Sequence, residues 1–143
     1  MLPESWHGVW RGSLTLRPPL KNFPPTSPME LRIAPKEKGR WSWVIAYSGQ
    51  PERGYELVAV AEKPGAFAMD EKNGILLDAV LEDNELLSAF EVDGLLLLTR
   101  YTLLPSGIRY TTQTFQKGAV GPHKVASWKP KSLQSALLKR ASG

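Results

Sequence analysis

The chain has 143 residues, of which 42% are apolar and 22% charged, a composition typical of one soluble globular domain, here residues 1–143. It contains no cysteine, which excludes disulfides, thiolate metal sites and cysteine nucleophiles. The formal net charge is +4, but no acidic residue follows Asp93 while eight Lys and Arg residues do, so residues 94–143 carry +8 and residues 1–93 carry −4. This asymmetry is typical of a solvated basic tail or of a surface for nucleic acid or anionic membrane.

The N-terminal segment has neither the basic region nor the apolar core of a signal peptide. No run of about 18 apolar residues is present that could span a membrane. We therefore expect a cytoplasmic protein.

The first patterned stretch is Trp6-His7-Gly8-Val9-Trp10-Arg11-Gly12, in which two glycines flank a tryptophan. Glycine weakens a strand unless a bend or a close backbone approach requires it. Residues 9–17 alternate between apolar and polar side chains, which predicts a half-buried strand. We expect Trp6 and Trp10 to lie in the core.

Five prolines follow between residues 18 and 28, which predicts a stiff connection. After it, turn signals recur every ten to fourteen residues, and no segment between them has a helical period. The pattern predicts eight strong strands and a weak one at 66–69. The strong strands are residues 9–17, 29–34, 41–47, 55–61, 75–81, 86–92, 95–104 and 108–116.

Beyond residue 117 the pattern changes into a basic tail, residues 118–143. Residues 119–130 are irregular, and residues 132–140 resemble a short helix with Ser132 as its N-cap and two basic residues at its end. The predicted fold class is therefore all-β, an up-and-down antiparallel barrel of about eight to nine strands over residues 6–117, with a short C-terminal helix. Closure into a barrel removes the two exposed edges of such a sheet. A barrel of this size is either filled by side chains or holds one small ligand, and the sequence leaves both open.

The segment Gly8-Val9-Trp10 resembles the first-strand motif of the calycin superfamily, which includes the lipocalins. The resemblance extends over roughly residues 6–117. It implies that Trp10 closes one end of the barrel, that a cation from a late strand packs across it, and that a ligand cavity lies above. Arg100 or Arg109 would supply the cation, and we assign Gly8, Trp10 and Arg109 to the barrel base. The proline-rich connection would be either a lid over the mouth, with Phe23 as its apolar contact, or a plain connector.

A row of aromatic residues on one strand forms either core or the wall of a ligand cavity. One arginine could enter that cavity and bind a carboxylate or phosphate through its fork. The candidate ligand-binding residues are Trp43, Tyr47, Tyr55, Phe90, Arg100 and Tyr110. Asp78 lies in an apolar strand and is either surface-exposed, paired with an arginine inside the barrel, or a ligand contact.

No catalytic motif, phosphate-binding loop or dinucleotide fingerprint is present, and His7 and His123 lack metal-ligand spacing. We therefore expect no cofactor, no metal and no enzymatic activity. The first hypothesis is a protein that binds a small, mostly apolar ligand. The alternatives are a filled barrel whose basic half binds protein or nucleic acid, a haem-binding calycin using His123, and a cavity isomerase or lyase. Nucleic acid is disfavoured because basic and aromatic residues do not interleave. A homodimer through residues 95–98 stays open.

Overall fold

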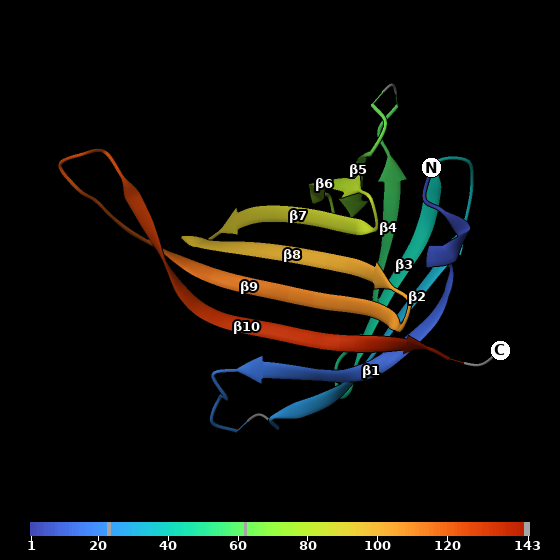
Figure 1. Cartoon of the computed structure of the whole chain (residues 1–143), viewed down its shortest axis with the longest axis horizontal. Helices are drawn as coiled ribbons and strands as arrows, with labels where there is room; N and C mark the ends of the chain where they lie inside the picture. The colour runs from blue at the N-terminus through green and yellow to red at the C-terminus, as the bar shows by residue number, and fades with distance from the viewer. Residues whose placement is uncertain (23, 62, 142–143) are drawn as a thin grey trace.

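The computed structural model describes residues 1–22, 24–61 and 63–141. Within them, ten antiparallel strands close into a barrel, each paired with its neighbours along the chain and the last with the first (Figure 1). A short 3-10 turn, η1 (Glu4–Trp6), precedes them. The strands are β1 (Gly8–Arg17), β2 (Thr26–Pro35), β3 (Arg40–Tyr47), β4 (Arg53–Ala59), β5 (Ala66–Asp70), β6 (Leu76–Glu82), β7 (Glu85–Val92), β8 (Leu95–Leu104), β9 (Gly107–Val120) and β10 (Ala126–Arg140).

The all-β antiparallel barrel expected from the alternating pattern is confirmed. In β3 the side chains of Trp41, Trp43 and Ile45 are buried while those between them are less so, as a period of two requires when one face meets the core. The predicted weak strand at residues 66–69 is β5. The described residues contain no helix long and apolar enough to cross a membrane.

The predicted C-terminal helix is wrong, because residues 126–140 form β10. This strand pairs with β1 on one side and β9 on the other, which raises the number of strands to ten. Ala136 and Leu138 are buried, whereas Leu137 between them is 37% exposed. The burial therefore repeats every second residue, and the pairing satisfies backbone groups of β1 and β9 that would otherwise form open edges.

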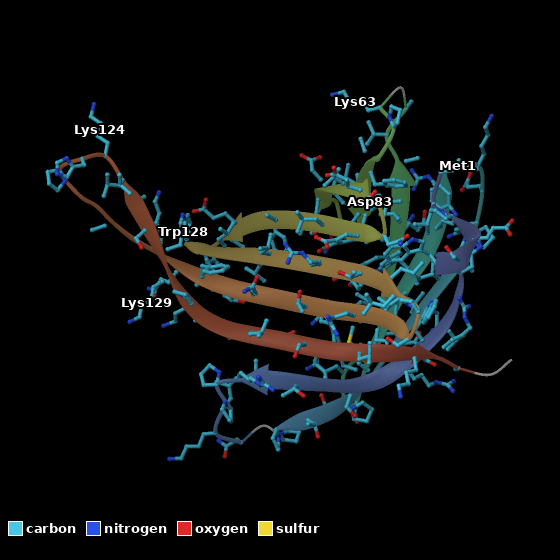
Figure 2. All side chains as sticks on the ribbon, viewed as in Figure 1. Met1, Lys63, Asp83, Lys124, Trp128 and Lys129 are labelled. Carbon is cyan, nitrogen blue, oxygen red and sulfur yellow. The ribbon has the colours of Figure 1, made fainter. Side chains whose placement is uncertain are left out.

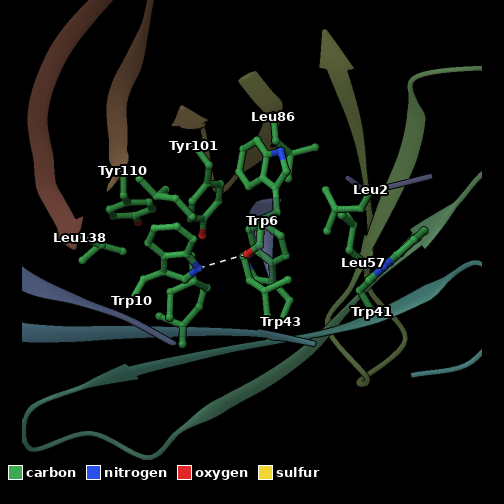
Figure 3. Close-up of a cluster of buried hydrophobic side chains, with 14 of the residues drawn as sticks. Leu2, Trp6, Trp10, Trp41, Trp43, Leu57, Leu86, Tyr101, Tyr110 and Leu138 are labelled. Atoms are coloured by element: carbon green, nitrogen blue, oxygen red, sulfur yellow. Dashed lines mark hydrogen bonds between the residues drawn. The ribbon is translucent and has the colours of Figure 1, made fainter. Parts of the chain in front are cut away.

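Aromatic side chains close one end of the barrel (Figure 3). Trp6 descends from η1 into the interior and is fully buried, with its ring centroid 6.3 Å from that of Trp43. The indole Nε1 of Trp10 donates a hydrogen bond of 3.1 Å to the Trp6 carbonyl. We call this end, formed by Trp6, Trp10 and Trp43, the plug. Its position fixes the opposite end as the mouth.

Two glycines allow β1 to run close beside β10 at the plug. A Cβ at Gly12 would collide with the backbone carbonyl of Leu137. Gly8 has a φ of +137°, and a Cβ there would meet the guanidinium of Arg140. Of the two reasons expected for glycine in this strand, a bend or a close backbone approach, the close backbone approach is present at Gly12.

Candidate ligand-binding cavity

A cavity of about 350 Å³ occupies the barrel between the plug and the mouth. Its wall includes residues from the mouth ends of many strands, such as Leu16 of β1, Ile45 of β3, Leu77 of β6 and Leu97 of β8. These residues face inward because each strand alternates its side chains between the interior and the outer surface. The side chains of the described residues thus leave part of the barrel interior unfilled.

The floor of the cavity is aromatic and continues into the plug. The ring centroid of Tyr101 lies 5.0 Å from that of Trp43 in an edge-on arrangement and 5.1 Å from that of Tyr110. Tyr101 and Tyr110 line the cavity, whereas Trp43 lies beneath Tyr101 (Figure 3). Packed aromatic rings of this kind make a mostly apolar floor.

A short hydrogen-bond chain runs along the wall formed by β8 and β9. The Thr112 hydroxyl donates to the Tyr110 hydroxyl at 2.6 Å, and Thr99 and Thr112 are joined by a hydrogen bond of 3.2 Å. The cross-strand register pairs Thr99 directly with Thr112. Because the Tyr110 oxygen accepts a hydrogen bond here, its own proton remains available for donation to a ligand.

Three tyrosines of the cavity, Tyr47, Tyr55 and Tyr101, are held in their neutral form. Burial raises the pKa of the Tyr47 hydroxyl well above its usual value, and the neighbouring Tyr110 raises it further. Burial likewise raises the pKa values of Tyr55 and Tyr101. At neutral pH these groups are therefore phenols that donate and accept hydrogen bonds, without a negative charge.

Among the lining residues that the structure describes, charge is confined to the rim of the cavity. Of the described lining residues, Arg53 at the start of β4 and Glu71 just after β5 carry charged side chains. The Arg53 guanidinium carbon lies 5.3 Å from the centre of the Tyr47 ring, within the range of a cation–π contact. A molecule in this cavity would meet apolar and neutral polar groups inside and opposite charges at the entrance.

The structure brings together four of the six residues predicted to bind ligand, because Tyr47, Tyr55, Phe90 and Tyr110 all line the cavity. Trp43 is fully buried below the floor and does not line it. Arg100 does not reach the cavity. It lies on the outer face of β8, where its Nε is 2.7 Å from a carboxylate oxygen of Glu85.

The cation across Trp10 is Arg140, so the assignment of Arg100 or Arg109 to this position is wrong. The Arg140 guanidinium carbon lies 4.1 Å from the Trp10 ring centre, and Arg109 is exposed on β9. Arg140 also donates to the carbonyls of His7 at 2.6 Å and Ser5 at 3.0 Å. The register of β10 against β1 pairs Arg140 with Trp10, and interpreting this segment as a helix concealed that pairing.

Sequence reasoning missed Leu97, Thr99, Tyr101 and Thr112 as cavity residues. A signal was present in the alternation along residues 95–104, which places Leu97, Thr99 and Tyr101 on one face. The proline-rich connection contributes Pro24 to the wall, and Ser27 follows at the start of β2. Phe23, the expected contact of a lid, lies outside the described residues.

Other polar candidates lie away from the cavity. Asp78 is exposed on β6, in agreement with the first of its three interpretations. His123 is exposed in the turn between β9 and β10, and the helix expected to follow it is absent. The described residues contain no group of three or more His, Asp or Glu side chains that could hold a metal ion.

Glu56 forms a charge cluster on the outer surface of β4. Its carboxylate is 2.7 Å from Lys36 Nζ, 2.9 Å from Arg40 Nη1 and 3.2 Å from Lys72 Nζ, and the residue is 4% exposed. The hydrogen bond from Lys36 is the largest influence on the pKa of Glu56 and lowers it. Burial raises this pKa, but the hydrogen bonds from Arg40 and Lys72 lower it further, so that it is about 2. This cluster ties β4 to the turn before β3 and to the turn after β5.

Comparison with known proteins places the fold and leaves the activity open. No family model and no curated protein matches the chain. The crystal structure of a DUF3598-family protein of unknown function from Nostoc punctiforme superposes on 99% of this chain with a TM-score of 0.68 and 15% sequence identity. The chain spans about half of that protein, 49% of its length. EF1p2_mFAP2b bound to DFHBI covers 96% of this chain and 95% of its own, with 12% identity and a TM-score of 0.46. At 15% identity, the likeness to the DUF3598 protein shows a shared fold alone.

Proposed function

We propose that this protein binds a small, mostly apolar molecule inside its barrel. The observation that carries the proposal is the cavity of about 350 Å³, closed below by the aromatic plug and bounded by walls of apolar and neutral polar side chains. Its volume falls within the roughly 300–1,000 Å³ typical of ligand pockets. The motif Gly8-Val9-Trp10, with a cation packed across the tryptophan, supports the calycin resemblance and with it the same function.

The polar groups of the wall favour a ligand with an apolar body and a neutral hydrogen-bonding group. Tyr110, Thr112 and Thr99 offer hydroxyls deep in the cavity, and no described lining residue there carries a charge. A buried carboxylate would lack a cationic partner at that depth, which makes its entry costly. Arg53 at the rim would suit a charged group only at the end of the ligand that faces solvent.

Binding without catalysis is the favoured form of this function. The raised pKa values of Tyr47 and Tyr101 make their phenolate forms too scarce to act as bases near neutral pH. Arg53 and Glu71 stand at the entrance and are the charged members of the described lining. The interior therefore offers a site for solvation and recognition of a guest molecule.

Titration with the neutral fluorescent probe N-phenyl-1-naphthylamine tests this proposal. The unmodified protein should enhance the emission of the probe and saturate at one probe per chain. Ser88→Phe places a ring in the cavity, whereas Ala89→Phe on the same strand places it on the exposed outer face. Binding should weaken at least tenfold in Ser88→Phe and stay unchanged in Ala89→Phe. Equal binding in the two variants, both folded by circular dichroism, would exclude the cavity as the site.

Native mass spectrometry of freshly purified protein complements the titration. A mass excess that disappears on denaturation would identify the class of a molecule that copurifies with the barrel. The same excess should be absent from Ser88→Phe and present in Ala89→Phe.

A further inference from the structure

The last hairpin of the chain projects beyond the barrel wall (Figure 1). The pairing of β8 with β9 starts at Leu95 and Gln116, and the pairing of β1 with β10 ends at Arg17 and Leu133. Residues 117–132 therefore form sheet pairs only within the β9–β10 hairpin, and we call them the ribbon. None of the residues of the ribbon is buried, so the ribbon contributes no side chain to the core of the barrel.

The ribbon is uniformly basic. It contains Lys117, Lys124, Lys129 and Lys131, all exposed, and no acidic residue. The ion pairs found among the described residues involve none of these lysines. Figure 2 shows Lys124 at the far tip and Lys129 nearer the barrel, both directed outward. Four unneutralised cations on so small an element favour a polyanionic partner.

Apolar side chains accompany the lysines. Val120 and Val125 flank the turn at the tip and are 58% and 69% exposed. Trp128 is half-buried near the base of the ribbon (Figure 2). Exposed valines at a hairpin tip, a tryptophan behind them and lysines on both sides form the combination that suits the interface of a lipid bilayer.

The composition argues against nucleic acid as the partner. The ribbon has no Arg, Asn or Gln, the side chains that most often hydrogen-bond to base edges. Trp128 is the only aromatic ring in it except His123, so it offers no row of rings for stacked bases. Valines at the tip would gain nothing from a phosphate backbone, whereas they gain from contact with acyl chains.

We propose that the ribbon docks on the surface of an anionic lipid bilayer. The lysines contact the anionic headgroups, and Val120, Val125 and Trp128 enter the interfacial region. The ribbon leaves the barrel at the mouth, because Gln134, two residues beyond its end, lines the cavity. Docking would bring the mouth of the cavity close to the bilayer, which would suit the proposed binding of an apolar ligand. The docking inference itself does not depend on a ligand.

Cosedimentation with vesicles tests the electrostatic part. The protein should bind vesicles containing roughly 30% phosphatidylserine in phosphatidylcholine, bind pure phosphatidylcholine far less, and be released by high salt. Lys124→Glu/Lys129→Glu should weaken binding more than about 25-fold, at about fivefold for each positive charge removed. The control Lys38→Glu/Lys139→Glu has the same net charge, and its two exposed sites lie toward the plug, so it should keep binding.

Fluorescence quenching by brominated phospholipid tests the depth of insertion. Of the five tryptophans, Trp6, Trp10, Trp41 and Trp43 are at most 4% exposed, so Trp128 is the one that bilayer lipid can reach. Brominated vesicles should quench a fraction of the emission in the unmodified protein and none in Trp128→Phe. Absence of quenching in the unmodified protein, with binding retained, would overturn the insertion of Trp128.

The remaining outcomes decide against the inference. If Lys124→Glu/Lys129→Glu and Lys38→Glu/Lys139→Glu lose vesicle binding equally, the binding depends on net charge and not on the ribbon. Binding to mixed-sequence duplex DNA that is lost in Lys124→Glu/Lys129→Glu, without vesicle binding, would make the ribbon a nucleic-acid surface. A further outcome is that the unmodified protein does not bind vesicles and that Lys124→Glu/Lys129→Glu aggregates. The lysines would then serve to prevent the free strand edges of the ribbon from pairing with other chains. Probe binding tests the cavity and vesicle binding tests the ribbon. The failure of one proposal can therefore be told from the failure of the other.

Discussion

At the scale of single residues, Arg140 links the N-terminal turn to the end of the last strand. It covers the ring of Trp10 and donates to two backbone carbonyls on the segment that carries Trp6 into the plug. A charged donor to a carbonyl and a cation over an indole are each stabilising, and here one side chain supplies both. The plug is therefore fastened by a residue 130 positions later than Trp10 in the chain.

Replacing Arg140 should lower stability while leaving the fold intact. Arg140→Ala should reduce the free energy of unfolding by about 1–2 kcal/mol, because the cation–π contact and the carbonyl hydrogen bonds are lost while the exposed position limits each. Arg109→Ala removes an exposed arginine of the same half of the chain and should change stability by less than about 0.5 kcal/mol. Urea unfolding measures the free energy of unfolding of both variants. Equal losses of stability would mean that the contacts of Arg140 do not stabilise the protein specifically.

Glu56 gives the protein a specific sensitivity to acid. Its pKa in the folded protein is about 2, below the usual 4.5, because three cations surround the carboxylate. The folded state thus prefers the ionised form, so this stabilisation is present above about pH 4.5 and is lost as the pH falls through 2. Glu56→Gln should unfold at lower urea at pH 7 and lose less stability than the unmodified protein between pH 4.5 and 2. In Glu91→Gln, an exposed control, the pH dependence should match that of the unmodified protein.

At the scale of elements, β10 decides whether the sheet closes. It lies between β9 and β1, so its removal would leave both with unpaired backbone groups. It also supplies Leu138 to the core, Gln134 to the cavity and Arg140 to the plug. A docked helix would have had none of these consequences.

Truncation should therefore abolish folding of the barrel. A chain ending at residue 131 should lack a cooperative thermal transition and aggregate, because two open edges are exposed. Circular dichroism and gel filtration measure this. A monomeric truncated chain with a sharp transition would contradict the role of β10 as the closing strand.

The close approach of β1 to β10 at Gly12 predicts that a larger side chain there lowers stability. Gly12→Val should destabilise the protein by about 1–3 kcal/mol or more, because the new side chain meets the Leu137 carbonyl and strands must separate. Ser13→Val, the next position on the same strand, adds a similar side chain and should have the smaller effect in the same urea titration.

At the scale of the whole molecule, the barrel is divided into a packed end and an open end. The plug holds the fully buried Trp6 and Trp43, whereas the mouth encloses a cavity and carries the projecting ribbon. Local stability follows the density of packing and pairing. The part of the molecule proposed to bind partners is thus the part that holds the cavity and the exposed ribbon.

Hydrogen exchange should reveal this gradient. Amides of β9 from residue 108 to 115, paired on both sides, should exchange far more slowly than those of residues 117–120 and 126–132, which have one partner strand. A bound cavity ligand should slow exchange at the mouth ends of the strands more than at the plug. Uniform protection along β9 would contradict the division.

The sequence by itself determined the class of the fold. Alternation of side chains and regular turns set nine antiparallel strands, Gly8 and Gly12 marked the close approach at Trp10, and the aromatic positions at 47, 55, 90 and 110 indicated the cavity wall. These features are local, since period and turn chemistry depend on neighbours in the chain.

Only the tertiary structure decided the identity of the last strand and the partners across the barrel. Residues 132–140 carry Leu and Ala at spacings that fit either a helix or a strand, and the open edges of β1 and β9 select the strand. That choice places Arg140 on Trp10. Cross-barrel contacts depend on register and closure, which are properties of the whole sheet that no local pattern contains.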